Sequence, residues 1–205
     1  EIRKDMEKFL HDKSNSFEKN VIYRSSLAAG PLADWVKAIL KYSGVDVDAL
    51  SEDALRAKCL EFGMEVDEQM GKGKLIDELF GEKVEANLIQ PTFIIDYPVE
   101  MSPLTKKHRS KEGLVERFEL FVNGKEIANA YSELNDPIDQ KERFEDQLRL
   151  AEKGDDEAMA MDHDFIRSLE YAMPPTSGIG IGIDRLTMLM TNQASIQEVL
   201  FFPQM

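Results

Sequence analysis

Residues 177–183 constrain the fold more than any other stretch, because glycine and isoleucine alternate along them. A period of two is typical of a β-strand, in which successive side chains point to opposite faces of the sheet. The alternation predicts a strand with Gly178, Gly180 and Gly182 on one face and isoleucines packed into the core on the other. Because glycine weakens a strand, we infer that this bare backbone accommodates a flat or bulky ligand.

Arg185 comes directly after the predicted strand, where Leu186, Leu189 and Met190 indicate a helix. Its guanidinium fork is suited to binding a polyphosphate. The glycine spacing matches neither the G-x-G-x-x-G pattern of dinucleotide-binding folds nor a P-loop. The alternative interpretation is close packing of helix against strand, with Arg185 as an ordinary surface residue.

Asn123-Gly124 is the clearest hairpin signal in the chain, because it separates apolar runs at residues 118–122 and 125–131. Asparagine and glycine supply the two positive φ angles that a type I′ turn requires. The sequence therefore predicts an antiparallel pair of strands joined by this two-residue turn.

Glu119 and Glu126 lie on one face of the predicted hairpin. Unbroken pairing places Phe121 opposite Glu126 and Glu119 opposite Ala128, so the two glutamates are diagonal neighbours roughly 7 Å apart. Two carboxylates at this separation repel each other unless a cation lies between them or one is protonated. Mg²⁺ is the natural cation for carboxylate and phosphate oxygens. The alternative is an exposed glutamate pair with no role.

Asn129, Tyr131 and Glu133 alternate along the end of the second hairpin strand. A carboxylate pairs with an ammonium group, while an amide and a phenol fix orientation, so this set suits a small zwitterion. Strict alternation places these residues on the face opposite Glu126. They share a pocket with both glutamates only if a β-bulge lies between Glu126 and Asn129, and we expect such a bulge.

Residues 31–89 are predicted to form a helical scaffold or insertion. Ser51 is a good N-cap, Gly44 a good helix stop, and Pro31 can occupy a first helical turn. We expect Trp35 and Cys59 to be core residues, since they lie on apolar helix faces. Residues 1–30 carry no motif and stay unassigned.

Residues 90–205 contain the predicted strands and the candidate catalytic and binding residues. The only concentrated basic stretch, at 105–111, follows a short apolar strand at 91–98. A solvated loop is its simpler interpretation, and a mobile loop contacting phosphate or an acidic partner is the alternative. Asp136-Pro137 then predicts the start of a helix.

The charge balance disfavours unaided binding of nucleic acid. The 205 residues contain 25 Lys and Arg against 39 Asp and Glu, which gives a net charge of −14, whereas nucleic-acid binding normally requires a basic face. The single cysteine favours a reducing compartment such as the cytoplasm. The sequence shows no export leader and no apolar run long enough to span a membrane.

Taken together, these motifs resemble those of the class II aminoacyl-tRNA synthetases. The alternation of glycine and isoleucine that ends in Asp184-Arg185 is similar to motif 3 of that class. Four stretches resemble the lysine-specific members of that class in particular, namely residues 117–121, 124–136, 174–178 and 200–203. The resemblance extends over residues 31–205 and is dense from residue 90 onward.

The resemblance implies an α+β fold, with an antiparallel sheet flanked by helices, and assigns residues 90–205 to the class II catalytic core. It also implies a lysine–tRNA ligase activity, in which ATP converts lysine to lysyl-adenylate and the lysyl group passes to tRNA(Lys). Matched positions then take the family's roles. Glu119 and Glu126 hold Mg²⁺, Asn129, Tyr131 and Glu133 bind lysine, Gly178, Gly180 and Gly182 lie along ATP, and Arg185 binds its γ-phosphate as the catalytic arginine.

The match is partial. Neither motif 1, the family's homodimer element, nor motif 2 is identified, and Arg24 lacks the context of the motif 2 arginine. The anticodon-binding domain is not identified either. We therefore expect the carboxy-terminal part of a catalytic domain that does not charge tRNA by itself and reaches tRNA(Lys) through the full-length protein. The alternatives are a non-catalytic paralogue that binds lysine or nucleotide as a sensor, and a ligase paralogue with another acceptor.

Overall fold

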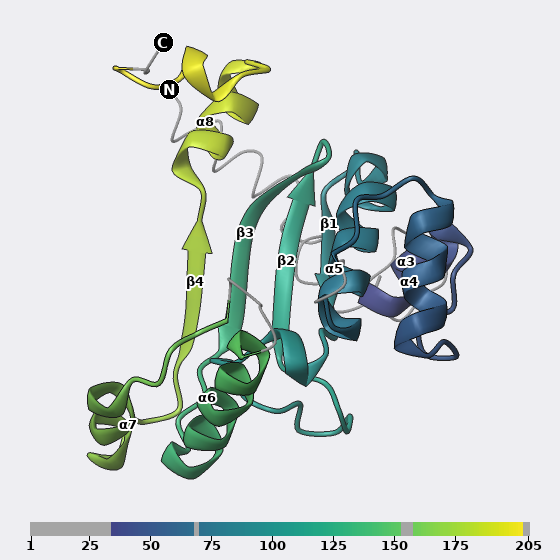
Figure 1. Cartoon of the computed structure of the whole chain (residues 1–205). Coiled ribbons are helices and arrows are strands. Elements are labelled where there is room, and N and C mark those ends of the chain that lie inside the picture. The colour runs from purple at the N-terminus through teal and green to yellow at the C-terminus, as the bar shows by residue number, and fades with distance from the viewer. Residues whose placement is uncertain (1–33, 68–69, 153–157, 203–205) are drawn as a thin grey trace.

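The computed structural model describes residues 34–67, 70–152 and 158–202, so the unassigned segment 1–30 lies outside the described residues. The centre of the fold is an antiparallel sheet of β1 (Thr92–Ile95), β2 (Arg117–Val122), β3 (Lys125–Ser132) and β4 (Ser177–Ile181). The strands lie side by side in the order in which they occur in the chain. Figure 1 shows helices on several sides of this sheet. The predicted α+β class is confirmed.

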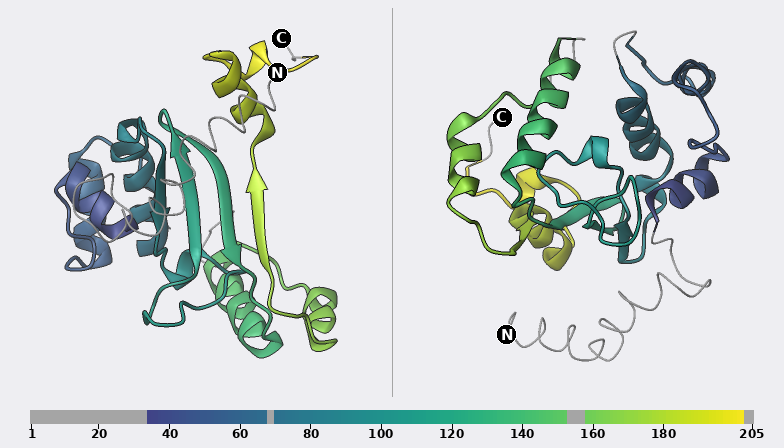
Figure 2. Two further views of the ribbon diagram at one scale, coloured as in Figure 1. Left: turned by 180° about the vertical axis from the view of Figure 1, so that it is seen from behind. Right: turned by 90° about the horizontal axis from the view of Figure 1, so that it is seen from below.

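The helices form three groups around the sheet (Figures 1 and 2). The helices α3 (Trp35–Ser43), α4 (Glu52–Glu61) and α5 (Lys72–Lys83) lie beside β1. Helices α6 (Pro137–Ala151) and α7 (His163–Glu170) lie at the end of the sheet away from the β2–β3 turn. Helix α8 (Ile183–Thr191) follows β4 at the other end of the sheet. Short 3₁₀ turns are η1 (Glu85–Asn87), η2 (Val99–Met101) and η3 (Ile196–Glu198).

Capping residues begin the helices much as predicted. The Ser51 side chain accepts a hydrogen bond from the backbone N–H of Ala54, and Asp136 caps α6 in the same way. Helix α3 begins at Trp35, because the Asp34 carboxylate accepts a hydrogen bond from the Lys37 N–H and makes Asp34 the N-cap. Pro31, predicted to occupy a first helical turn, lies outside the described residues.

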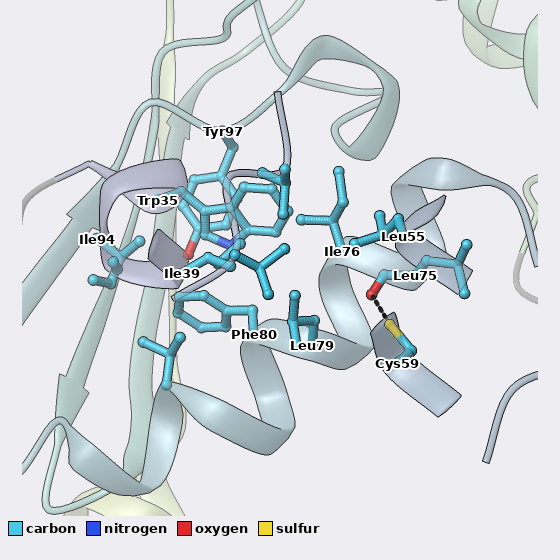
Figure 3. Packing of buried hydrophobic residues seen from close by; sticks show 14 of the residues in the cluster. Trp35, Ile39, Leu55, Cys59, Leu75, Ile76, Leu79, Phe80, Ile94 and Tyr97 are labelled. Atoms are coloured by element: carbon cyan, nitrogen blue, oxygen red, sulfur yellow. Dashed lines mark hydrogen bonds between the residues drawn. The ribbon is translucent and has the colours of Figure 1, made fainter. Parts of the chain in front are cut away.

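One apolar core joins the helical scaffold to the sheet (Figure 3). The Trp35 ring lies 5.8 Å from the rings of both Phe80 and Tyr97, and Phe80 meets Phe121 of β2 edge-on at 5.7 Å. Trp35 and Cys59 are fully buried, as predicted. The core spans the boundary predicted at residue 90, and that domain division stays a prediction.

Within the described residues, no helix combines the length and apolar character needed to cross a membrane.

Candidate functional site

A β-bulge interrupts the pairing of β2 with β3. Phe121 faces Glu126 and Leu120 faces Ala128, so Ile127 is an extra residue on β3. The bulge lies within the interval predicted from the sequence. An extra residue reverses the side-chain alternation beyond it. Side chains of β3 after Ile127 therefore lie on the face opposite to the one that unbroken alternation would give them.

The bulge changes the partner of Glu119. This residue faces Asn129, so the expectation that it faces Ala128 is wrong, because that expectation assumed unbroken pairing. The Asn129 amide nitrogen donates a hydrogen bond of 3.3 Å to the Glu119 carboxylate. Glu119, Glu126, Asn129 and Tyr131 consequently share one face of the sheet.

Glu119 is held on both of its carboxylate oxygens. Oε1 accepts hydrogen bonds from Arg117 Nη2 and from the Asn129 amide. Oε2 accepts a hydrogen bond of 2.7 Å from the Tyr97 hydroxyl. Burial, together with the negative charge of Glu119, raises the pKa of Tyr97 well above its usual value, so the hydroxyl keeps its proton and remains a donor.

Glu126 and Arg185 meet near the β2–β3 turn. Arg185 Nη1 donates a hydrogen bond of 2.9 Å to the Glu126 backbone carbonyl and lies 3.6 Å from its carboxylate. Burial and then the charge of Glu119 raise the pKa of Glu126, while Arg185 opposes the shift. Burial and the same two glutamates, with Asp77, also raise the pKa of Glu85 in η1. The carboxylates at this end of the sheet therefore repel one another, although Arg117 and Arg185 partly offset their charge.

Glu133 lies against the glycine side of β4. Tyr131 pairs with Gly178 across the β3–β4 ladder, and the Glu133 N–H donates to the Thr176 carbonyl at 2.9 Å. A Cβ atom at position 178 would stand 2.2 Å from Glu133 Oε1. The carboxylate thus occupies space that only a glycine leaves free, and burial raises its pKa.

A family model described as tRNA synthetases class II (D, K and N) matches residues 2–205 of the chain. The chain belongs to this family.

The curated relatives of the chain include lysine–tRNA ligases from three bacteria. Identity is 69% over 170 residues with the Porphyromonas gingivalis protein, 68% over 168 with that of Christiangramia forsetii, and 62% over 170 with that of Azobacteroides pseudotrichonymphae. The alignments cover 83%, 82% and 83% of this chain and 29%, 30% and 34% of the relatives. The chain therefore spans about a third of the length of these class II synthetases.

The glycines of the class II motif divide between two elements. Gly178 and Gly180 are in β4, where they pair with Tyr131 and Asn129. Gly182 is the N-cap of α8 and not a strand residue, and its N–H donates to the Ile127 carbonyl. The predicted strand is thus shorter by one glycine, because β4 turns into the helix that carries Arg185.

The isoleucines between these glycines do not pack into the core, so that expectation is wrong. The side chains of Ile179 and Ile181 are 60% and 49% exposed. Their exposure shows that no described element packs closely over this face of β4, which is also an edge strand of the sheet among the described residues.

Two residues of the site were not singled out from the sequence, namely Arg117 and Tyr97. Arg117 lies two residues before Glu119 on β2, and alternation alone places the two on one face. Tyr97 reaches Glu119 across 22 positions of sequence, and no local pattern indicates that contact.

The class II family implies Mg²⁺ together with ATP. Across residues 34–67, 70–152 and 158–202, no three His, Cys, Asp or Glu side chains are placed to hold a metal ion by themselves. Glu119 and Glu126 fit a different arrangement, in which one or two carboxylates and substrate phosphate oxygens complete the coordination. Burial and then the charge of Glu119 raise the pKa of Glu126, and a bound cation would offset both effects.

The basic stretch at 105–111 is bound to the rest of the chain. Lys107 pairs with Asp139 at 3.0 Å, Arg109 with Glu116, and Lys111 with Asp96. These contacts favour the simpler interpretation, a surface loop whose basic groups are largely satisfied within the chain.

Proposed function

We propose that the chain is the part of a lysine–tRNA ligase that binds lysine and ATP for the formation of lysyl-adenylate. The observation that carries the proposal is the bulge at Ile127, because it brings Glu119, Glu126 and Asn129 onto one face. Without this extra residue the candidate metal site and the candidate lysine pocket would lie on opposite sides of the sheet. The names of the relatives support lysine as the amino acid.

The lysine pocket is formed by Asn129, Tyr131 and Glu133. Glu133 pairs with an ammonium group of the substrate, since a carboxylate beside a bare glycine backbone is open to a cationic ligand. Asn129 and Tyr131 orient the rest of the molecule through amide and ring contacts. Their common location beside β4 supports a single pocket.

ATP lies along Gly178, Gly180 and Gly182, with Arg185 on its γ-phosphate and Glu119 and Glu126 toward its metal ion. Arg185 is half-exposed, which leaves its guanidinium group accessible to a phosphate. Mg²⁺, when bound, neutralises phosphate charge. The lysine carboxylate then attacks the α-phosphate and pyrophosphate leaves, so the residues act by positioning and charge complementarity.

The second step and the partners belong to the proposal for the whole protein. The lysyl group passes from the adenylate to the terminal ribose of tRNA(Lys), which the acidic chain reaches as part of a full-length homodimer. The buried thiol of Cys59 agrees with a reducing compartment, and we assign the activity to the cytoplasm.

Isothermal titration of the chain tests this function. We expect the chain to bind L-lysine and to bind ATP more tightly with Mg²⁺ than without it. Glu133→Gln should weaken lysine binding at least tenfold while changing ATP affinity less than twofold. Glu61→Gln is the matched control, because Glu61 is an exposed glutamate on α4, remote from the sheet. A chain that binds neither ligand contradicts the proposal.

Lysine-dependent exchange of pyrophosphate into ATP separates the ligase from a lysine or nucleotide sensor. The ligase containing this segment catalyses the exchange, whereas a sensor binds its ligand without exchange. We expect little exchange by these 205 residues alone, because the motif 2 arginine is not identified in them.

A further inference from the structure

Arg117 occupies a position between the two halves of the proposed site. It lies at the start of β2, where it faces Tyr131, and its side chain is largely buried. None of the roles proposed above uses this residue, although a buried guanidinium group requires several hydrogen-bond acceptors.

The guanidinium group contacts one residue of each subsite. Nη2 donates to Oε1 of Glu119 on the metal side, and Nε donates to Oδ1 of Asn129 on the lysine side, at 3.2 Å. A single planar group therefore sets the relative position of a carboxylate on β2 and an amide on β3.

The same group is itself fixed by residues outside the sheet. Nη1 donates to the Ser102 hydroxyl at 3.0 Å and to the Met101 carbonyl at 3.2 Å. The guanidinium carbon also lies 4.5 Å from the centre of the Tyr97 ring, a cation–π contact. Because Tyr97 donates to the other oxygen of Glu119, the carboxylate is held from two directions.

The contacts also determine which way the Asn129 amide points. Its oxygen accepts from Arg117 and its nitrogen donates to Glu119, so the reversed amide would place a donor against Arg117 and an acceptor against a carboxylate. A second lone pair on the oxygen and a second N–H on the nitrogen remain for a ligand.

We propose that Arg117 is a positioning residue that couples the two subsites, holding the Glu119 carboxylate for Mg²⁺·ATP and the Asn129 amide for lysine. This inference rests on the proposed function of the same face. Lysine cannot replace arginine in this role, since an ammonium group is a point charge without a planar fork.

The test compares three affinities of the purified chain by isothermal titration. For Arg117→Met we expect L-lysine affinity and the Mg²⁺-dependent gain in ATP affinity each to fall at least tenfold. ATP affinity measured in EDTA should stay within twofold, because the glycine face and Arg185 do not contact Arg117. Arg117→Lys should lose nearly as much of the two affinities as Arg117→Met, although it keeps the positive charge. It also serves as the second variant if the methionine variant does not fold.

Arg109→Met is the matched control, since Arg109 also forms an arginine–carboxylate pair, with Glu116, but lies exposed on the loop at 105–111. All three affinities should stay within twofold of those of the wild type in this variant. A structural role for Arg117 would instead lower all three affinities together, ATP in EDTA included, and would overturn the inference. So would an Arg117→Met chain that binds lysine and Mg²⁺·ATP as well as the wild type. A wild-type chain that binds no ligand overturns the proposed function itself, and the inference with it.

Discussion

The Glu133 carboxylate fills the space beside Gly178. A Cβ atom added at position 178 would stand 2.2 Å from Oε1 of Glu133, far inside van der Waals contact. The backbone at Gly178 has no positive φ angle, so the requirement for glycine comes from the carboxylate and not from the chain's conformation.

Gly178→Ala should therefore displace the Glu133 side chain without unfolding the protein. The nearest atom is the far end of a flexible side chain, which can turn away, whereas the strand itself tolerates alanine. We expect L-lysine affinity to fall at least tenfold and ATP affinity to fall much less, both measured by isothermal titration.

Gly81→Ala is the control for this change. Gly81 lies in α5, and apart from its chain neighbours and the adjacent helix backbone nothing lies within 4 Å of the Cβ that alanine would add. Alanine should raise the free energy of unfolding by up to about 1 kcal/mol and leave lysine binding unchanged. Unchanged lysine affinity in the Gly178→Ala chain would show that Glu133 does not contribute to the pocket.

The sequence could predict the hairpin but not the identity of every partner across it. Asn123 and Gly124 take the positive φ angles, 53° and 70°, that the turn requires. The chemistry of the residues predicts the bulge, because a common pocket for Glu126 and Asn129 requires it. No pattern in the apolar residues marks Ile127 as the extra residue.

Long-range contacts limited the rest of the prediction. The alternation in β4 predicts correctly that Gly178 and Gly180 share a face, but the burial of Ile179 depends on what covers the other face, and local sequence does not contain that information. The Tyr97–Glu119 hydrogen bond likewise depends on how the segment after β1 returns to β2.

Arg185→Gln should weaken ATP binding without destabilising the fold. Arg185 and its partner Glu126 are both partly exposed, and exposed ion pairs contribute little to stability. We expect the free energy of unfolding to change by less than about 0.5 kcal/mol and ATP affinity to fall at least tenfold, as measured by denaturant titration and calorimetry.

Arg149→Gln provides the comparison, because Arg149 is an exposed helical arginine paired with Asp146 at 2.7 Å on α6. It should leave both stability and ATP affinity near those of the wild type. If Arg185→Gln binds ATP as tightly as Arg149→Gln, the assignment of Arg185 to the phosphate site is wrong.

Leu79→Ala should destabilise the joint core of scaffold and sheet. Leu79 is fully buried in the cluster that contains Trp35 and Phe80. Loss of a buried leucine side chain leaves a cavity and costs roughly 2–5 kcal/mol. Trp35 is the only tryptophan, so its fluorescence during urea unfolding reports this change directly.

Leu60→Ala tests whether burial is the cause. Leu60 lies on α4 with its side chain 57% exposed, and its truncation should change the free energy of unfolding by less than about 0.5 kcal/mol. Equal destabilisation by both substitutions would contradict the assignment of the core to α3, α5 and the sheet.

The ionised Glu116 carboxylate should make the stability of the protein depend on pH in the acidic range. Hydrogen bonds from Arg109 and from the Ser132 hydroxyl at 2.8 Å lower the pKa of Glu116 from 4.5 to about 2. Because the folded-state pKa is the lower one, the interaction stabilises the fold fully above about pH 4.5. That stabilisation is lost as the pH falls toward 2.

Arg109→Met removes the main cause of this shift and should raise the pKa of Glu116 toward 4.5, as followed by carbon NMR titration of its carboxyl group. The stability difference between wild type and variant should therefore be largest near neutral pH and vanish as the pH falls through about 2. Lys58→Met, which disrupts a remote ion pair with Glu61, should leave the Glu116 titration unchanged. If Glu116 still titrates near 2 without the Arg109 side chain, the Ser132 hydroxyl and backbone donors account for the low pKa.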